Sequence, residues 1–382
     1  MRRSSSLLLA GLAAGSLAVF FMVACGGTET AVGTTGSGSG TSSGSGGGGP
    51  AVDLAHPPEP AEGAGAPDGT GSTVLAIRKL YLGDTDRDNK PNKANGWKQY
   101  GYDLDGLAST STSNDLCKPR NNASPKSLYP DGNNGIDNSF GHNILSIILN
   151  IASDASAKVN QGIGEGKFTI MLSMDKLGSG KSYKGVDTKL YGGADLGSAP
   201  LFTGADKWPV IPELLKVETD ITSAKVDFPN AYIVNNTWVS GSKGEVLLSL
   251  SVSGFTLQLP IASAILTMEL SEDHKTASKG TIAGILPTEV LTSELKKIAG
   301  AFDPTLCKGP TIESIISQIE QASDILKDGT QNKDSDCDGI SIGLGFDAAI
   351  VQLGAIAAKA GPKEDPCNAM GTGSSSSTGT GM

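Results

Sequence analysis

Short acidic stretches are the parts of this chain with the most capacity for chemistry. The first is GDTDRDNKPNKAN, in which Asp84, Asp86 and Asp88 occupy alternate positions. Calcium takes about six to eight oxygen ligands, and a turn of this kind offers three carboxylates from one loop. A complete EF-hand would carry Gly and Glu where this chain has Asn89 and Asn95. We therefore favour a solvated polar turn, with a looser calcium turn as the alternative.

Three further acidic stretches accompany the first. DLDG supplies Asp103 and Asp105, which we expect near the first cluster across a hairpin. PDGNNGIDNSFG is predicted to be a tight loop, because Gly and Asn tolerate positive φ, and a site is its alternative. Its candidate ligands are Asp131, Asn133, Asn134 and Asp137.

The last acidic stretch, DSDCDG, covers residues 334–339 and begins like a calcium loop, with Gly339 at the sixth position. The alternating segment ISIGLGF follows at once and predicts a strand, so the loop cannot continue as an EF-hand. We predict a turn that is clamped by a disulfide through Cys337 and that leads into the last core strand. Calcium completed by another loop is the alternative.

Signals for catalysis are weak, and no catalytic residue is predicted. His56 lies in a linker-like segment, which leaves His142 and His274, and no GxSxG, SxxK or HExxH motif occurs. Paired carboxylates for glycoside cleavage depend on spatial separation, so the sequence nominates no pair. The aromatic residues Trp97, Tyr100 and Tyr102 could stack on a ligand. We favour the alternative, in which they pack under the N-terminal hairpin.

The N-terminus has the parts of a secretory signal. Arg2 and Arg3 precede an apolar run that closes at Met22-Val23-Ala24-Cys25. This final stretch, residues 22–25, resembles the lipobox of bacterial lipoproteins. The resemblance implies cleavage before Cys25, lipidation of that residue, and a membrane anchor. Gly26 rather than Asp follows Cys25, which in that family implies the outer membrane or cell surface.

Composition divides the chain after the signal peptide of residues 1–24. Residues 25–72 are rich in Gly, Ser, Thr and Pro and are expected to form a disordered tether. Residues 73–368 are expected to fold as one β-rich domain, and residues 369–382 to form a disordered tail. Removal of Arg2 and Arg3 with the signal leaves 28 basic against 40 acidic residues, a net charge of −12. This balance argues against a nucleic-acid partner, and we expect a monomer.

Four cysteines remain besides Cys25. An even number in an oxidising compartment predicts two disulfides, and no spacing suggests zinc. Three pairings are possible. We favour Cys307 with Cys337, which flank one helical segment, and hence Cys117 with Cys367.

Period-2 alternation dominates the folded part and predicts half-buried antiparallel strands. Helical spacing with Pro at the start and Gly at the end predicts helices over residues 287–300 and 310–329, and GHNILSIILNIASDA predicts a third. The expected fold is mainly β (α+β), an antiparallel β-sandwich-like core with two or three helices packed at its edge. The expected strands are TVLAIRKLYL, FTIMLSM, EVLLSLSVSGFTLQL, ILTMEL and ISIGLGF.

The stretches LYLGD, WKQYGYDLDG, NSFG and CDGISIGLGF, together with the lipobox and linker, resemble large secreted lipoproteins numerous in myxobacteria. The resemblance implies secretion and location, and it implies no activity. We expect a lipid-anchored envelope protein that binds a ligand or surface partner without chemistry. An extracytoplasmic hydrolase acting on polysaccharide and a structural envelope protein are the alternatives. No cofactor beyond possible calcium is expected.

Overall fold

The computed structural model describes residues 54–241, 243–252, 255–302, 304–359 and 367. They belong to a contact unit that begins at Ala51. The predicted lipidation site Cys25 and the predicted tail lie outside the described residues. None of the helices within the described part is long and apolar enough to cross a membrane.

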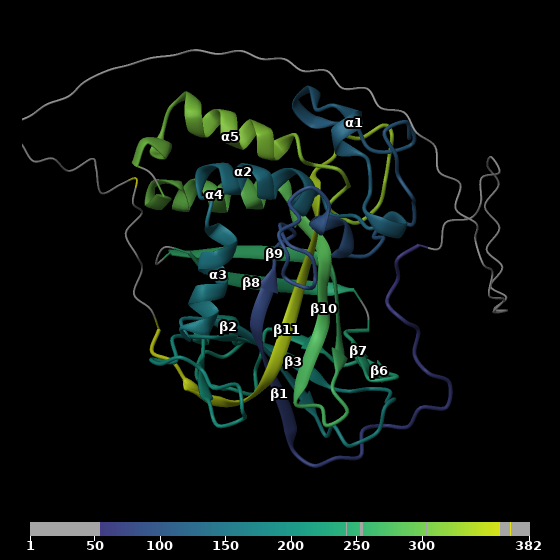
Figure 1. The fold of residues 1–382 in the computed structure, drawn as a ribbon, viewed down its shortest axis with the longest axis vertical. Coiled ribbons are helices and arrows are strands. Elements are labelled where there is room, and N and C mark those ends of the chain that lie inside the picture. Colours follow the sequence, from purple (N-terminus) through teal and green to yellow (C-terminus); the bar gives the residue numbers. More distant parts are fainter. Residues whose placement is uncertain (1–53, 242, 253–254, 303, 360–366, 368–382) are drawn as a thin grey trace, which may run out of the picture. The chain divides into compact units, whose positions relative to one another are not determined.

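Eleven strands of the described chain join in one mixed sheet (Figure 1). The order is β1-β2-β3-β4-β11-β10-β9-β7-β6, with β5 added to β3 and β8 added to β9. The bounds are β1 Ser72–Tyr81, β2 Thr169–Asp175, β3 Thr188–Gly193, β4 Lys207–Val210, β5 Val226–Phe228, β6 Tyr232–Val234, β7 Thr237–Val239, β8 Gly244–Val252, β9 Phe255–Leu270, β10 Thr276–Pro287 and β11 Gly339–Ile356. The predicted β-rich α+β fold is confirmed.

Strand β11 organises the sheet because it is long enough to pair in several directions. Its residues from Gly339 to Ala349 lie antiparallel to β10, those from Gly345 to Val351 lie antiparallel to β1, and its last residues run parallel to β4. Since β1 also pairs with β2, and β3 with both β2 and β4, these pairings close a circuit from β11 back to β11. The parallel β4 pairing was not expected from the antiparallel signals.

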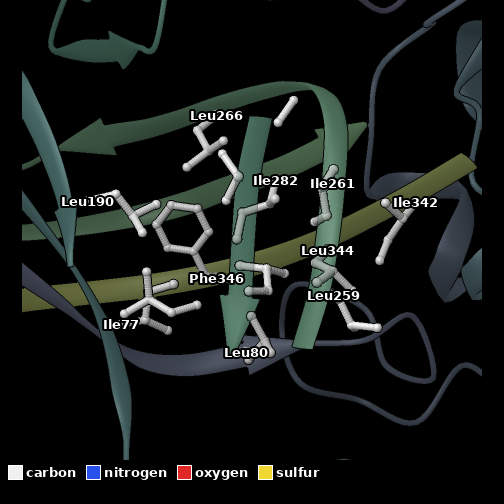
Figure 2. Close-up of a cluster of buried hydrophobic side chains, with 14 of the residues drawn as sticks. Ile77, Leu80, Leu190, Leu259, Ile261, Leu266, Ile282, Ile342, Leu344 and Phe346 are labelled. Carbon is white, nitrogen blue, oxygen red and sulfur yellow. The ribbon is translucent and has the colours of Figure 1, made fainter. Parts of the chain in front are cut away.

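Alternating side chains of β1 and β2 reach two different cores. Leu75 and Leu172 join the main cluster, whereas Ala76 and Met171 join a smaller cluster around Trp208. Both faces of these strands are therefore buried, as expected of interior strands. In the main cluster, side chains from β1, β3, β9, β10 and β11 point toward one another around Phe346 (Figure 2).

The helices are α1 Pro125–Leu128, α2 Leu145–Ile151, α3 Ala155–Gly164, α4 Thr288–Phe302 and α5 Pro310–Glu320. A π-helical turn, Phe140–Ile144, leads into α2. Helices α2, α4 and α5 gather at one end of the sheet (Figure 1), with α4 packed on β9, β10 and α5. Helix α5 ends at Glu320 rather than at the predicted Gly329. The residues after Glu320 instead follow an irregular path to β11.

The folded unit begins earlier than the predicted boundary at Ser72. Residues before β1 have no regular structure, yet they bond to the domain. The Ala55 N–H donates to the Asn134 carbonyl at 2.8 Å, and the Ala55 carbonyl accepts from the Asp103 N–H at 2.9 Å. The Tyr183 hydroxyl donates to Asp68 Oδ1 at 2.8 Å. Low hydrophobicity therefore did not prevent this segment from lying on the domain, because its backbone groups find partners there.

Two disulfides form, as predicted, but the favoured pairing is wrong. Cys117 bonds to Cys337, and Cys307 bonds to Cys367. The irregular path after α5 carries Cys337 away from Cys307 to the stretch beside Lys118, where the N–H of Cys337 donates to the Lys118 carbonyl. Cys307 instead ends the 3-10 turn Pro304–Cys307, which follows α4, and a Cβ at Gly300 would meet both sulfurs of its disulfide. These disulfides place the folded domain in an oxidising, extracytoplasmic compartment.

Candidate metal centre

The structure brings together acids from separate loops into what we call the acidic centre, the carboxylates of Asp103, Asp105 and Asp137. One oxygen from each lies within 4.8 Å of the others. Asp103 and Asp105 come from the loop after Gly96–Gln99, and Asp137 comes from the loop before the π-helical turn. The centre thus joins DLDG to PDGNNGIDNSFG.

Local turn chemistry holds the first two acids. Asp103 Oδ1 accepts from the N–H groups of Gly106 and Leu107, at 2.8 and 3.2 Å. Asp105 Oδ1 also accepts from Leu107 N–H, at 2.9 Å. Such side-chain-to-backbone bonds two to four residues ahead are typical of Asp in turns. Gly106 supplies the positive φ of 82° that the turn requires.

The third acid is held from the opposite loop. Asn134 and Gly135 both adopt positive φ, which reverses the chain just before Asp137. Asp137 Oδ2 then accepts from the Leu104 N–H at 2.7 Å. The amide between Asp103 and Asp105 in the sequence therefore fixes Asp137 beside them.

Burial leaves one oxygen of the acidic centre without a partner. Asp103 and Asp137 are only 6 % and 4 % exposed. Asp103 Oδ1 has its two amide donors, but Asp103 Oδ2 is fully buried and accepts no hydrogen bond. A buried acceptor without a donor is costly and is uncommon in native proteins.

Two flanking acids, Asp131 and Asp324, add to the negative charge. Asp131 accepts from the Ser109 N–H. Asp324 accepts from the Ser341 N–H at 2.8 Å and from the Ser341 hydroxyl at 2.5 Å. Ser341 lies on β11, so the last core strand is connected to the centre.

Burial and neighbouring negative charge disfavour the deprotonated, charged forms of four of these acids. Burial, reinforced by repulsion from Asp105, raises the pKa of Asp131 to about 8 and the pKa of Asp324 to about 7. Burial and neighbouring acids also raise the pKa values of Asp105 and Asp137. Among the ion pairs of the described chain, none includes any of these five acids. The nearby Lys243 ammonium donates to the Leu104 carbonyl at 3.3 Å.

The predicted calcium turn at Asp84, Asp86 and Asp88 stays a prediction. These acids do not form a close carboxylate group within the described residues. Asp86 Oδ1 accepts from the Lys90 N–H at 2.8 Å, and Asp88 pairs with the Lys90 ammonium at 3.3 Å. Arg87 turns inward from the same loop and holds it by hydrogen bonds to Gln99, Gly280 and Thr281.

The aromatic residues predicted as a stacking surface face inward. Trp97 and Tyr100 are 3 % and 0 % exposed. Trp97 stacks on His142 at a centroid distance of 4.2 Å, and Tyr102 bonds through its hydroxyl to Thr267 at 2.7 Å. The packing alternative therefore describes the rings of Trp97 and Tyr100, and Tyr102 is half-buried.

DSDCDG is a disulfide-clamped turn that leads into β11, as predicted, with Cys117 rather than Cys307 as the partner of Cys337. Asp338 Oδ1 accepts from the Lys327 N–H at 2.8 Å. Asp334, Asp336 and Asp338 do not join the acidic centre. This stretch is therefore the turn from which β11 begins.

Four of the five acids were candidate ligands from the sequence, but the sequence did not predict that they lie close together. Asp324 lies in QASDILKDG, which the sequence presents as the end of a helix. Asp103 and Asp137 are separated by more than thirty residues of turns, so no local spacing connects them. The clearest sequence signal for the acidic centre was DLDG, in which two acids precede a turn glycine.

Comparisons with protein-family models, curated proteins and solved structures gave no match.

Proposed function

We propose that this chain is a lipid-anchored cell-envelope protein whose folded domain binds a ligand or surface partner without catalysing a reaction. The anchor rests on the leader that ends at Cys25 and on the Gly/Ser-rich stretch that follows it. Two disulfides in the folded part are consistent with export. The outer membrane or cell surface is the proposed location.

The burial of the acidic centre is the observation that supports a role other than catalysis. A general acid or base must come within hydrogen-bonding reach of its substrate. Asp103 and Asp137 are almost fully buried, and backbone amides of the Asp103 loop donate to one oxygen of each. A polysaccharide chain cannot reach carboxylates that are buried to this extent, whereas a small ion can lie between them.

One observation favours the hydrolase alternative. Asp131 is less buried than Asp137, and its pKa is raised to about 8. A carboxyl group that stays protonated near neutral pH can act as a general acid. Incubation of the purified protein with envelope polysaccharides tests this alternative. We expect no cleavage products, and cleavage that is lost in Asp131→Asn would contradict the proposal.

The anchor is tested by mass spectrometry of the N-terminal peptide from membranes of expressing cells. We expect a peptide that starts at Cys25 and carries acyl chains, and we expect Cys25→Ser to remain unprocessed. Cys117→Ser is a matched control, because it removes a different cysteine and should keep the acyl chains. A wild-type N-terminus without acyl chains would show that the lipobox assignment is wrong.

A further inference from the structure

We infer that Asp103, Asp105 and Asp137 bind a calcium ion. The inference rests on the contacts of the folded domain and is independent of the lipid anchor. Three carboxylates offer oxygens within 4.8 Å of one another. That spacing allows three oxygens to reach one cation at the 2.3–2.6 Å that calcium prefers, after small adjustments.

The acids in and around the acidic centre lack a balancing positive charge. Asp131 and Asp324 add further acids near the acidic centre, and after burial, repulsion from Asp105 is part of the cause of their raised pKa values. No lysine or arginine of the described chain forms an ion pair with any of the five. Buried charges are normally paired or coordinate a metal. A divalent cation would supply the missing positive charge.

Asp103 has one buried oxygen that is open to a ligand. Asp103 is 94 % buried, and its Oδ2 atom has no hydrogen-bond donor. The opposite oxygen, Oδ1, already accepts from Gly106 and Leu107. Oδ2 is therefore the atom that a cation in the centre would take.

Hydrogen bonds from neighbouring groups hold the carboxylates of the acidic centre, as they do the carboxylate ligands of metal sites. Gln331 Nε2 donates to Asp105 Oδ2 at 2.7 Å, and the Leu104 N–H donates to Asp137 Oδ2. Groups that bond to ligating carboxylates fix their orientation and raise metal affinity. Each of the three acids is thus held by a donor on at least one oxygen.

The ligand type selects the metal. The close group contains aspartates only, with no histidine or cysteine. Carboxylate oxygens suit hard cations such as calcium and magnesium, whereas zinc and copper favour nitrogen and sulfur. Magnesium demands nearly octahedral geometry, whereas calcium accepts irregular oxygen sets. Ligands drawn from two irregular loops therefore fit calcium better.

The direct test is calorimetric titration of the purified full-length protein, first treated with EGTA, with CaCl₂ and then with MgCl₂. We expect saturable calcium binding with a Kd in the range of about 10⁻⁵ to 10⁻³ M, and weaker binding of magnesium. At calcium about 100-fold above Kd, the Tm should rise by about 4 °C. Absence of both the binding heat and the Tm shift would overturn the inference. Equal affinity for magnesium would overturn the choice of calcium.

Variants separate a site from a general ionic effect. Asp105→Asn removes one charge but keeps the side-chain shape, so it should relieve repulsion in the calcium-free protein and raise its Tm. The same variant should weaken calcium binding at least about tenfold, because a charged ligand is lost. Asp84→Asn/Asp86→Asn is the matched control, since it removes two acids from the other predicted turn. Equal loss of binding in the control, or unchanged binding in Asp105→Asn, would contradict the assignment.

Discussion

Asn138 and Gly343 exchange two hydrogen bonds across the junction between the loop of Asp137 and strand β11. Asn138 Nδ2 donates to the Gly343 carbonyl at 3.0 Å, and the Gly343 N–H donates to Asn138 Oδ1 at 2.9 Å. The same amide donates to the carbonyls of Trp97 and Tyr100 and accepts from the Gly141 N–H. One buried side chain therefore joins segments from WKQYGY, NSFG and SIGLG, and Asp137 is its chain neighbour.

Replacing Asn138 should destabilise the domain severely. Asn138→Ala leaves several buried carbonyl and amide groups without partners, so we expect the free energy of unfolding to fall by about 3 kcal/mol or more. Urea denaturation followed by circular dichroism measures this. Asn133→Ala is the control, because Asn133 is exposed nearby and should change stability by less than about 0.5 kcal/mol. Similar losses in both variants would argue against the role of Asn138.

The two disulfides should differ in their effect on the acidic centre. Gln331 connects one of them to it, since Gln331 Oε1 accepts from the Cys117 N–H at 2.9 Å and Nε2 donates to Asp105. Cys117→Ser/Cys337→Ser should therefore lower both stability and calcium affinity. Cys307→Ser/Cys367→Ser should lower stability alone, each pair costing about 2–5 kcal/mol. Calcium titration of both double variants makes the comparison. A larger loss of calcium affinity in Cys307→Ser/Cys367→Ser than in Cys117→Ser/Cys337→Ser would refute the connection through Gln331.

Stability without calcium should fall as pH rises. The pKa of Asp324 is raised from its ordinary 3.8 to about 7, so between these values the folded chain keeps a proton that the unfolded chain has released. Folding is then favoured at the low end of this range and loses free energy toward the high end. Asp131 contributes in the same direction. Tm measured in EGTA from about pH 5 to pH 8 should decline, and Asp324→Asn should decline less. A Tm that rises over this range would contradict the raised pKa.

Arg87 should be needed for its shape as well as its charge. Its guanidinium donates to the Gly280 and Gln99 carbonyls and to Thr281 Oγ1, and it lies 4.9 Å from the Tyr100 ring centroid. Lysine keeps the charge but cannot form this planar fork. We expect Arg87→Lys to lower the free energy of unfolding by about 1–3 kcal/mol. Arg78→Lys, on an exposed position of β1, should have little effect; equal losses would contradict the argument.

Local patterns in the sequence predicted several elements well. β11 was predicted from Ile340, Ile342 and Leu344, which are all buried, and α4 from its apolar spacing after Pro287. β10 was missed, because its Ala/Gly-rich run weakens the alternation. Its register also shifts, between Ala277 and Gly280 against β11 and between Ser278 and Thr281 against β9. Periodicity reports burial on one face, so elements with small residues or irregular pairing leave a weak signal.

The acidic centre and the disulfide pairing could not be read from local patterns. The disulfide pairing, and the placing of Asp324 and Gln331 beside the acidic centre, depend on where the irregular stretch between α5 and β11 travels. That stretch carries Asp324, Gln331 and Cys337, and its path is set by long-range partners such as Ser341, Asp105 and Lys118. Turn propensity shows that the chain bends but not which distant group it meets.

The disulfide order has a consequence for biogenesis. The first cysteine of the folded part bonds to the third, Cys117 to Cys337, and the second bonds to the fourth, Cys307 to Cys367. A chain that emerges N-terminus first presents Cys307 to Cys117 before Cys337 has appeared. Oxidation in that order traps a wrong bond, which only attack by another thiolate can rearrange. The yield of native protein should therefore depend on a thiol–disulfide isomerase in the compartment that receives it, and a strong oxidant alone should accumulate misbridged chains.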